Sequence, residues 1–562
     1  MTAWATIRRA RIGAALPLFL VFALPAFVRG ADEPAKSGKP VKLTPVQLRA
    51  AADAAEKAGD WEAAFTNYCH LFVADRTSAD VRDKLNVALR RSQQLRRHRD
   101  PNFQQFAASM STTDAMRLFA EVVTKVPVLY VERERATPQI LWEHGIEELS
   151  RALDNPSFRQ AFFDGASVDK VESFRKTLRV NWAKQPVANA IDAQKFLRQL
   201  LSAADAAFTV RVRSALILEM VCGACAGLDE YTVFLNPSQW NPAAVATVPD
   251  MTAQGVYLGI ADGALVVAGV APGSWAALNT SLIKGDRISR LNGKTMEMTT
   301  LALAAEALRT PVDGFHEIET IGVESDNLSR LPVVVPTVYR TEVVNIKEGI
   351  GYIRIGSIAT TTPRELDEAV HWLKARGVRS VVIDLRGNMG GSFTAGVDTA
   401  KRLIPAGLIV TTQGQLSQVD NQPFSSDSGM SAHDIPAVVL VDGETASAAE
   451  VLAVALKDHN RATLVGMPTF GKGAIQYPVR LDALDEKDES GRPKTLKSGG
   501  VRLTIAKLIA PSGSPINGVG VMPHVLEMHP ARQREIAIEK AIELLPPLPR
   551  PMSPMSGLVN TP

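Results

Sequence analysis

The sequence predicts a multidomain α+β protein, with three kinds of pattern along the chain. Residues 45–245 are rich in apolar residues at helical spacing, which predicts an α-helical N-terminal region. Residues 246–336 hold short β-type runs separated by Asp-Gly, Pro-Gly and Asn-Gly turns, which predicts a small β domain. Over residues 337–545 apolar strands alternate with helices, which predicts an α/β core with a largely parallel sheet.

The composition is that of an ordinary globular protein, and it excludes several classes. The chain has 562 residues, of which 46% are hydrophobic and 22% charged. At about 150 residues each, this length accommodates roughly three or four domains. A mainly disordered, fibrous or polytopic membrane protein is excluded, and a net charge of +3 is too balanced for a nucleic-acid partner. Three cysteines supply no disulfide framework, so the fold depends on its apolar core.

The first 30 residues have the layout of a secretory signal peptide. Three arginines precede an apolar run, and small residues follow it, with cleavage expected near Gly30. An uncleaved membrane anchor is the alternative, because the run approaches the roughly 20 residues of a spanning helix. Loss of residues 1–30 removes four arginines and takes the net charge from +3 to −1. We expect an exported, periplasmic or extracytoplasmic protein that meets the membrane only transiently, through its signal.

The segments around the predicted domains differ in composition from the domains themselves. Residues 31–44 predict a flexible linker, and the Pro- and Met-rich residues 546–562 predict a disordered tail. Residues 45–100 contain, from Ala54 onward, the pattern of a single tetratricopeptide-like helix pair. One such repeat cannot bury its own apolar face, which favours a plain helical domain. An adaptor or partner protein bound by this region stays open, and residues 101–245 are expected to continue as helices towards the core.

Ser447 is a candidate nucleophile at the start of a helix. A buried strand ends at Val441, and small residues then open a helix at about Ser447. The backbone N–H groups at a helix N-terminus point outward and can hold an anion. Serine at this position is most often only a helix cap, so this segment alone leaves both roles open.

Lys472 is a candidate general base. The segment 462–476 nearly spells a phosphate-binding P-loop, but residue 473 is glycine where Mg²⁺ needs a hydroxyl, and residues 474–481 predict a strand instead of a helix. What remains is one lysine between two glycines beside apolar sequence. Burial lowers the pKa of a lysine, and a fall of about 3 units would suit a general base. An exposed surface lysine is the alternative.

A third segment, residues 380–391, predicts a buried strand that ends in a glycine-rich turn. Such turns lie at the edge where open α/β sheets bind ligands. Gly390 and Gly391 can offer N–H groups to a developing oxyanion, with the Ala448 N–H as a second donor. A tight strand-to-helix turn with no catalytic part is the alternative.

Other catalytic chemistry has less support. His459 falls at the far end of the helix that Ser447 begins, about 18 Å away, whereas His524 in its proline-flanked loop stays open. There is no H-E-x-x-H motif, and Cys222 and Cys225 lack a second pair of metal ligands, so core thiols are favoured over an incidental disulfide. We expect no metal and no cofactor.

Taken together, these segments resemble peptidase family S41, the carboxyl-terminal processing (tail-specific) proteases. The resemblance covers about residues 210–528. The matching motifs are D-x-R-x-N-x-G-G at 384–391, T-A-S-A-A-E at 445–450 and F-G-K-G-x-x-Q at 470–476.

The resemblance implies an exported serine endopeptidase that cleaves protein or peptide substrates near apolar C-termini. It implies Ser447 as the nucleophile, Lys472 as the general base and Gln476 as the residue that orients the lysine. The other implied residues are Ala448 and Gly391 in the oxyanion hole and Glu450 as a supporting polar neighbour.

The β-rich segment 246–336 resembles the PDZ domain of the same family. Such a domain binds a chain-terminal carboxylate on backbone N–H groups while the peptide adds a strand to a sheet edge. A module used only for packing or gating is the alternative. For the whole chain, the alternative to a peptidase is a catalytically silent PDZ and helical-repeat protein that binds exported proteins. The implied tail-binding residues are Gly255, Val256, Tyr257, Leu258 and Gly259.

Overall fold

The computed structural model describes residues 44–545 with short internal gaps. The predicted signal at 1–30, the linker at 31–44 apart from its last residue, and the tail at 546–562 lie outside the described residues. The gaps are residues 75–77, 241–255, 262–263, 271–275, 277–279, 297–303, 305–306, 309–310, 322–325, 333–335, 416–420, 428–432 and 492–493.

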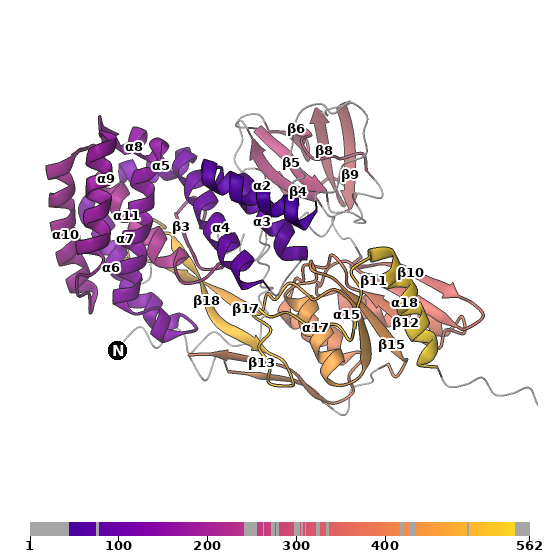
Figure 1. Ribbon diagram of the computed structural model, residues 1–562. Coiled ribbons are helices and arrows are strands. Elements are labelled where there is room, and N and C mark those ends of the chain that lie inside the picture. The colour runs from indigo at the N-terminus through magenta and orange to yellow at the C-terminus, as the bar shows by residue number, and fades with distance from the viewer. Residues whose placement is uncertain are drawn as a thin grey trace, which may run out of the picture.

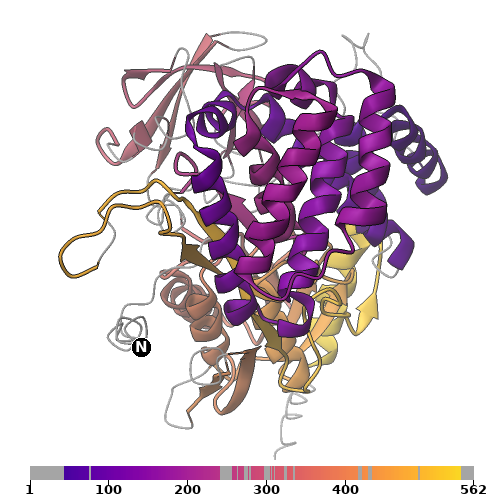
Figure 2. The same ribbon diagram turned by 90° about the vertical axis from the view of Figure 1, so that its left-hand side faces the viewer.

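Three bodies of secondary structure confirm the predicted fold class. Figure 1 shows the indigo and purple helices on one side, a pink β-sheet unit at the top and the mixed α/β body at the lower right. The quarter turn in Figure 2 brings the helical region to the front, with the pink β-sheet unit at the upper left. None of the helices in the described part of the chain combines the length and the apolar character needed to cross a membrane.

The first three helices pack on one another through a small apolar cluster. Tyr68 and Phe65 of the middle helix are buried against Ala52 and Ala88 of its neighbours. The third helix is long, and about 22 Å of it separates residue 82 from residue 97, at 1.5 Å per residue. These helices are α2 (Pro45–Ala58), α3 (Trp61–Ala74) and α4 (Ala79–Arg99).

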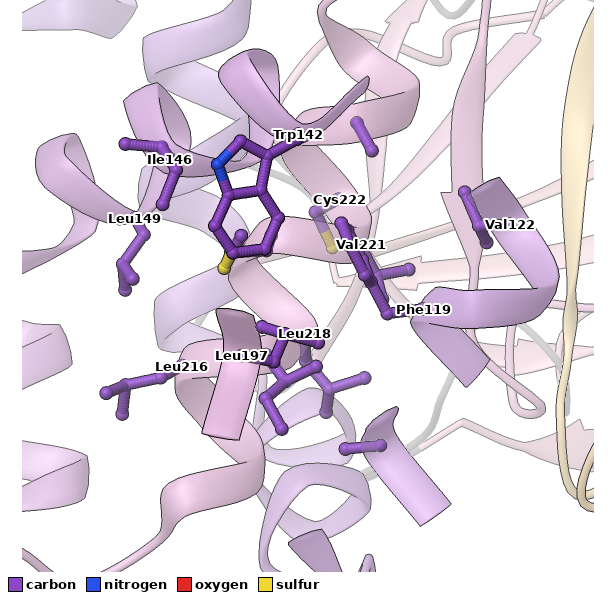
Figure 3. Packing of buried hydrophobic residues seen from close by; sticks show 14 of the residues in the cluster. Phe119, Val122, Trp142, Ile146, Leu149, Leu197, Leu216, Leu218, Val221 and Cys222 are labelled. Carbon is purple, nitrogen blue, oxygen red and sulfur yellow. The ribbon is translucent and has the colours of Figure 1, made fainter. Parts of the chain in front are cut away.

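The next helices form a larger core around Trp142. Figure 3 shows Trp142 among apolar side chains from several helices, with Cys222 close by. Cys222 and Cys225 are buried free thiols on one helix, and burial raises the pKa of Cys222 to about 12, so both act as apolar core residues. The helices are α5 (Pro101–Ser109), α6 (Thr112–Leu129), α7 (Pro138–Asp154), α8 (Pro156–Phe162), α9 (Val168–Thr177), α10 (Ala190–Ala207) and α11 (Arg213–Ala226).

The β-sheet unit is antiparallel and has its own apolar core. Its strands follow the order β4-β5-β6-β8-β9, with β7 beside β6, and β4 lies at one edge. The helix expected near residues 300–308 falls mostly outside the described residues. The strands are β4 (Val256–Ala261), β5 (Ala264–Val270), β6 (Arg287–Leu291), β7 (Lys294–Thr295), β8 (Phe315–Ile321) and β9 (Asp326–Pro332).

The α/β body contains a sheet of six strands in the order β10-β11-β12-β15-β16-β19. Every pair from β11 to β19 is parallel, whereas β10 is antiparallel to β11. The predicted largely parallel sheet is therefore confirmed. The strands are β10 (Val338–Asn345), β11 (Ile350–Ile355), β12 (Ser380–Asp384), β15 (Ala437–Val441), β16 (Ala462–Gly466) and β19 (Val525–Leu526).

Helices cover both faces of this sheet. Each parallel strand is added on the same side of the one before it, so right-handed crossovers place their helices on one face. One face packs against α15 (Thr362–Lys374), α16 (Phe393–Lys401) and α17 (Ala448–Asp458), and the other packs against α18 (Pro530–Glu543).

A second, antiparallel sheet joins the α/β body to the helical region. Its longest strand, β18, contributes Val501 and Leu503 to the core of the helical region and Leu508 to the core of the α/β body. The sequence did not predict this sheet as a separate layer. Its order is β14-β13-β18-β17, with β3 also on β18, and the strands are β3 (Val233–Leu235), β13 (Gly407–Gly414), β14 (Pro423–Ser426), β17 (Ala474–Arg480) and β18 (Gly500–Ile509).

Candidate active site

Three turns meet at the carboxyl ends of neighbouring parallel strands. They follow β12, β15 and β16, which is the edge where open α/β sheets place ligands. The Ala446 N–H donates to the Asn388 carbonyl at 2.9 Å, and the Phe470 N–H donates to the Thr445 carbonyl at 2.9 Å. The turn that contains Ser447 is therefore held between the other two.

Ser447 has a strained backbone conformation directly before α17. Its φ is 57° and its ψ is −120°, a combination that L-residues rarely adopt. Such strain costs on the order of 1–3 kcal/mol and persists only where the surrounding structure enforces it. Glu450, at the third position of the helix, accepts a 2.8 Å hydrogen bond from the Ser447 N–H and so fixes this turn.

The turn after β12 approaches the serine so closely that only glycine fits. A Cβ on Gly390 would lie 2.8 Å from the Ser447 Cβ and 2.9 Å from the Ala448 nitrogen. Gly390 and Gly391 both have positive φ, 95° and 144°, which a residue with a side chain would adopt only with strain. The glycines thus bring backbone next to the candidate nucleophile.

Of these two glycines, Gly391 is the better candidate for an oxyanion donor. The Gly390 N–H already donates to the Asn388 Oδ1 at 2.9 Å. Gly391 forms a parallel bridge with Ile358, and the bonds of this bridge use the Gly390 carbonyl and the Ser392 N–H. The N–H of Gly391 lies outside the bridge, and the Ala448 N–H, at the first position of α17, is the second candidate donor.

Glu450 connects the serine turn to the lysine turn. Its carboxylate is fully buried, and its Oε2 accepts 2.8 Å bonds from both the Ser447 N–H and the Lys472 N–H. Its Oε1 accepts from the Gly471 N–H at 2.7 Å and from the Thr469 hydroxyl. Because one oxygen binds both nitrogens, the backbones of Ser447 and Lys472 are at most two such bond lengths apart. The structure therefore brings together the two sequence-predicted residues.

Lys472 is buried, with 8% of its surface exposed. The pKa of its amine is lowered from 10.5 to about 8: burial is the largest cause, the positive charge of Arg502 acts in the same direction, and Glu450 opposes the shift. Burial also raises the pKa of Glu450, although hydrogen bonds from Thr469 and the backbone lower it in part. An amine with a pKa near 8 is partly neutral at neutral pH, as a general base must be.

Gln476 lies on β17, four residues after the lysine, and is buried. Its Nε2 donates to the Ala474 carbonyl at 3.0 Å, next to an irregularity in the pairing of β17 with β18. Its side-chain amide is thereby held in one orientation beside the lysine turn.

The residues expected to bind a substrate tail are not part of this cluster. Gly255 lies outside the described residues. Val256, Tyr257, Leu258 and Gly259 belong to β4, in the β-sheet unit that Figure 1 shows well apart from α17.

The support that the loop at 516–521 gives to the lysine turn was not predicted from the sequence. The Thr469 hydroxyl accepts from the Val521 N–H at 2.7 Å, and the Gly518 N–H donates to the Gly471 carbonyl at 2.8 Å. The signal in the sequence is the pair Gly518 and Gly520, whose φ values are 74° and 72°. No three His, Cys, Asp or Glu side chains of the described residues are grouped so that they could hold a metal ion.

Several known proteins are similar to this chain in sequence. Residues 349–526 match the family model for peptidase family S41. A carboxyl-terminal-processing protease of Synechocystis sp. is 31% identical over 306 residues, which span 53% of this chain and 68% of that protein. A chloroplastic C-terminal processing peptidase of Tetradesmus obliquus is also 31% identical, over 53% of this chain and 64% of the relative. This chain thus matches about two thirds of the length of these relatives. A solved photosystem II D1 C-terminal processing protease is 25% identical and covers 74% of this chain and 94% of its own, with a TM-score of 0.39.

Proposed function

Because this chain belongs to peptidase family S41, as a serine-type C-terminal processing peptidase, we propose that Ser447 and Lys472 form its catalytic dyad. The observation that carries this proposal is the shared Glu450 oxygen, which holds the backbones of both residues at 2.8 Å. The pKa of about 8 for the buried lysine supports it, since the base must be neutral before it takes a proton.

The proposed reaction proceeds through an acyl-enzyme. The neutral Lys472 amine takes the proton of the Ser447 hydroxyl as Oγ attacks the scissile carbonyl carbon. The negative charge on the carbonyl oxygen is stabilised by the N–H groups of Ala448 and Gly391. The lysine then gives the proton to the leaving amine. Lys472 next deprotonates a water molecule, which hydrolyses the acyl-enzyme and restores the serine.

Gln476 and Glu450 act on the dyad without taking part in covalent steps. The proposal assigns to Gln476 the orientation of the lysine amine, on the basis of its fixed amide beside the lysine turn. It assigns to Glu450 the positioning of the two backbones. A carboxylate that binds backbone N–H groups can do this without itself entering the proton transfer.

The proposed substrates are exported proteins with apolar C-termini, captured by the β-sheet unit as by a PDZ domain. Within the described residues β4 pairs only with β5, so its other edge can take up a peptide as an added strand. The signal-like residues 1–30 support a periplasmic or extracytoplasmic location. In that case the mature N-terminus, read by peptide sequencing of protein from an exporting host, lies near Gly30.

A serine-directed covalent probe, together with a substrate that has an apolar tail, tests the dyad. We expect the probe to label the wild type and not Ser447→Ala. We expect Ser447→Ala, Lys472→Ala and Lys472→Arg to leave the substrate uncut, since a guanidinium does not lose its proton. Lys540→Ala, at an exposed lysine on α18, is the matched control and should cut normally. Normal cleavage by Ser447→Ala or Lys472→Ala would overturn the dyad, and an unlabelled wild type that binds the tail would favour a silent binding protein.

A further inference from the structure

Helix α4 is anchored in the helical core by a buried charge network at its C-terminal end. The Arg97 guanidinium lies 2.7 Å from the Glu219 carboxylate and 2.8 Å from that of Glu148. Gln94, on the preceding turn, donates to the Glu148 carbonyl at 3.0 Å. Glu219 is fully buried, so this end of α4 has one fixed position against α7 and α11.

The opposite end of α4 reaches the loop behind the lysine. The Arg82 Nη2 donates to the Gly518 carbonyl, across 436 positions of sequence. Its guanidinium carbon lies 5.3 Å from the centre of the Phe72 ring on α3, an arrangement in which the ring face attracts the cation. The Phe72 ring of the neighbouring helix α3 therefore helps to orient Arg82 towards the loop.

The loop at residues 516–521 packs directly on the lysine turn. The Gly518 N–H donates to the Gly471 carbonyl at 2.8 Å, and Gly471 in turn donates to Glu450. A Cβ on Gly473 would come within 2.3 Å of the Asn517 nitrogen, so backbone rests on backbone on both sides of Lys472. One residue, Gly518, thus binds Arg82 through its carbonyl and the lysine turn through its N–H.

We propose that Arg82 is a positioning residue for the peptidase reaction, which acts through Gly518 to hold the lysine turn closed against Glu450 and the serine. The inference rests on the proposed Ser447–Lys472 dyad. It makes the N-terminal helices part of the catalytic apparatus, although residues 349–526 alone match the family model. A docking contact with no effect on the reaction is the competing explanation.

Loss of the Arg82 contact should loosen the lysine turn and admit water to the Lys472 amine. Water that enters around the amine favours its charged form. The charged groups that act on Lys472 are Arg502 of β18 and Glu450 of α17, and neither changes in an Arg82 variant. The acid limb of the kcat profile, which reports the base in the enzyme–substrate complex, should therefore move to higher pH. Substrate capture by the β-sheet unit should be unaffected, so KM should stay constant.

The test compares Arg82→Met with the wild type. Methionine keeps an apolar stem for packing on Phe72 and removes the donors. We expect kcat to fall about tenfold at neutral pH, with KM within about twofold and the acid limb at higher pH. Arg82→Lys keeps a charged donor and should recover most of both effects. If Arg82→Met fails to fold, Arg82→Leu, which also removes the donors, takes its place. The matched control is Arg96→Ala. Arg96 lies on α4, as Arg82 does, and its substitution removes an exposed ion pair with Glu62 of α3.

The outcomes separate this inference from the proposed function. If the serine probe does not label the wild type, the proposed dyad is overturned, and the role of Arg82 is overturned with it. If the wild type is labelled while the kcat and pH profile of Arg82→Met equal those of Arg96→Ala, the dyad stands and the role of Arg82 is overturned. A change in KM alone, with an unshifted acid limb, would also overturn it. For Arg82→Lys, an acid limb as displaced as that of Arg82→Met supports a need for the planar guanidinium, and a profile equal to the wild type supports the charged donor.

Discussion

Two fully buried carboxylates lie at the ends of neighbouring parallel strands, and they are stabilised in opposite ways. Asp384, at the end of β12, is bound by side chains: Arg386 at 2.6 Å, Arg354 at 3.0 Å and the Tyr352 hydroxyl at 2.7 Å. Glu450, in the first turn of α17, is bound by three backbone N–H groups and the Thr469 hydroxyl. The first site is ionic, and the second uses neutral donors.

This difference gives the two carboxyl groups opposite pKa shifts. Burial would raise the pKa of Asp384, but the hydrogen bond from Arg386 and the charge of Arg354 lower it below its usual value. Burial raises the pKa of Glu450, and its neutral donors offset only part of that rise. Asp384 therefore contributes stability above its unfolded pKa and loses it in acid, whereas Glu450 costs stability as pH rises through its folded pKa. A carboxylate that is paired with two arginines stays ionised and has a structural role. A carboxylate that is bound by backbone N–H groups can hold two turns together without placing a further cation beside Lys472.

The largest expected effect is the loss of the ionic site. Asp384→Asn keeps the shape of the side chain but leaves two partly buried guanidinium groups without a counter-charge. Breaking a buried pair in this way costs about 3–5 kcal/mol in the free energy of unfolding, which urea denaturation measures. Asp398→Asn, which breaks an exposed pair with Lys401, should cost less than about 1 kcal/mol. Equal losses in the two variants would mean that the arginines do not depend on Asp384.

The next effect is a gain in stability when the buried Lys472 amine is removed. The folded pKa of Lys472 is about 8 and its ordinary value is 10.5. Below pH 8 the buried amine therefore keeps its proton at a cost in the free energy of folding. Lys472→Met should raise the free energy of unfolding at pH 7 by about 3 kcal/mol, at 1.36 kcal/mol for each pKa unit.

The sign of the pH dependence distinguishes this cause from better packing. Between pH 8 and 10.5 the unfolded chain binds the proton and the folded one does not, so the wild type gains stability as pH rises. The difference between Lys472→Met and the wild type should therefore shrink across this range in urea titrations. A difference that stays constant from pH 7 to 10.5 would contradict a buried, depressed amine. Lys540→Met, at an exposed lysine, is the control and should match the wild type throughout.

The smallest expected change in stability is at Glu450, whose hydrogen-bond donors are all neutral. The expected change in activity there is large. Glu450→Gln presents an amide NH₂ group where backbone N–H groups need an acceptor. The cost of leaving such groups unsatisfied is about 1–3 kcal/mol, reduced because the burial of a charge is relieved. Cleavage should fall about 100-fold, since the serine and lysine backbones lose their common acceptor. Glu368→Gln, at an exposed glutamate on α15, should leave both quantities unchanged. A fully active Glu450→Gln would show that the dyad does not need this carboxylate.

The parts of the molecule that the sequence predicted are those with local signals. Alternating apolar strands and helices predicted the parallel sheet, and short motifs located Ser447, Lys472 and the Gly390–Gly391 turn. The second sheet was missed because β13, β17 and β18 pair across long stretches of sequence with no local mark of their register. Glu450 was expected only as a polar neighbour, because its donors at 469–472 lie about twenty positions away and its bonds form only when the two turns meet. Arg82 gave no signal, since nothing in an amphipathic helix indicates a distant backbone carbonyl.

The order in which the parallel strands join the sheet has a consequence for biosynthesis. In the six-stranded sheet, β11, β12, β15, β16 and β19 lie side by side in chain order. The serine turn therefore leaves the ribosome before the lysine turn, and the loop at 516–521 follows both. A nascent chain that ends before residue 472 carries Ser447 without Lys472, the proposed base, and without the Gly471 and Lys472 N–H groups that bind Glu450 in the folded protein. With the proposed dyad, proteolytic activity therefore requires nearly the whole polypeptide to have been made.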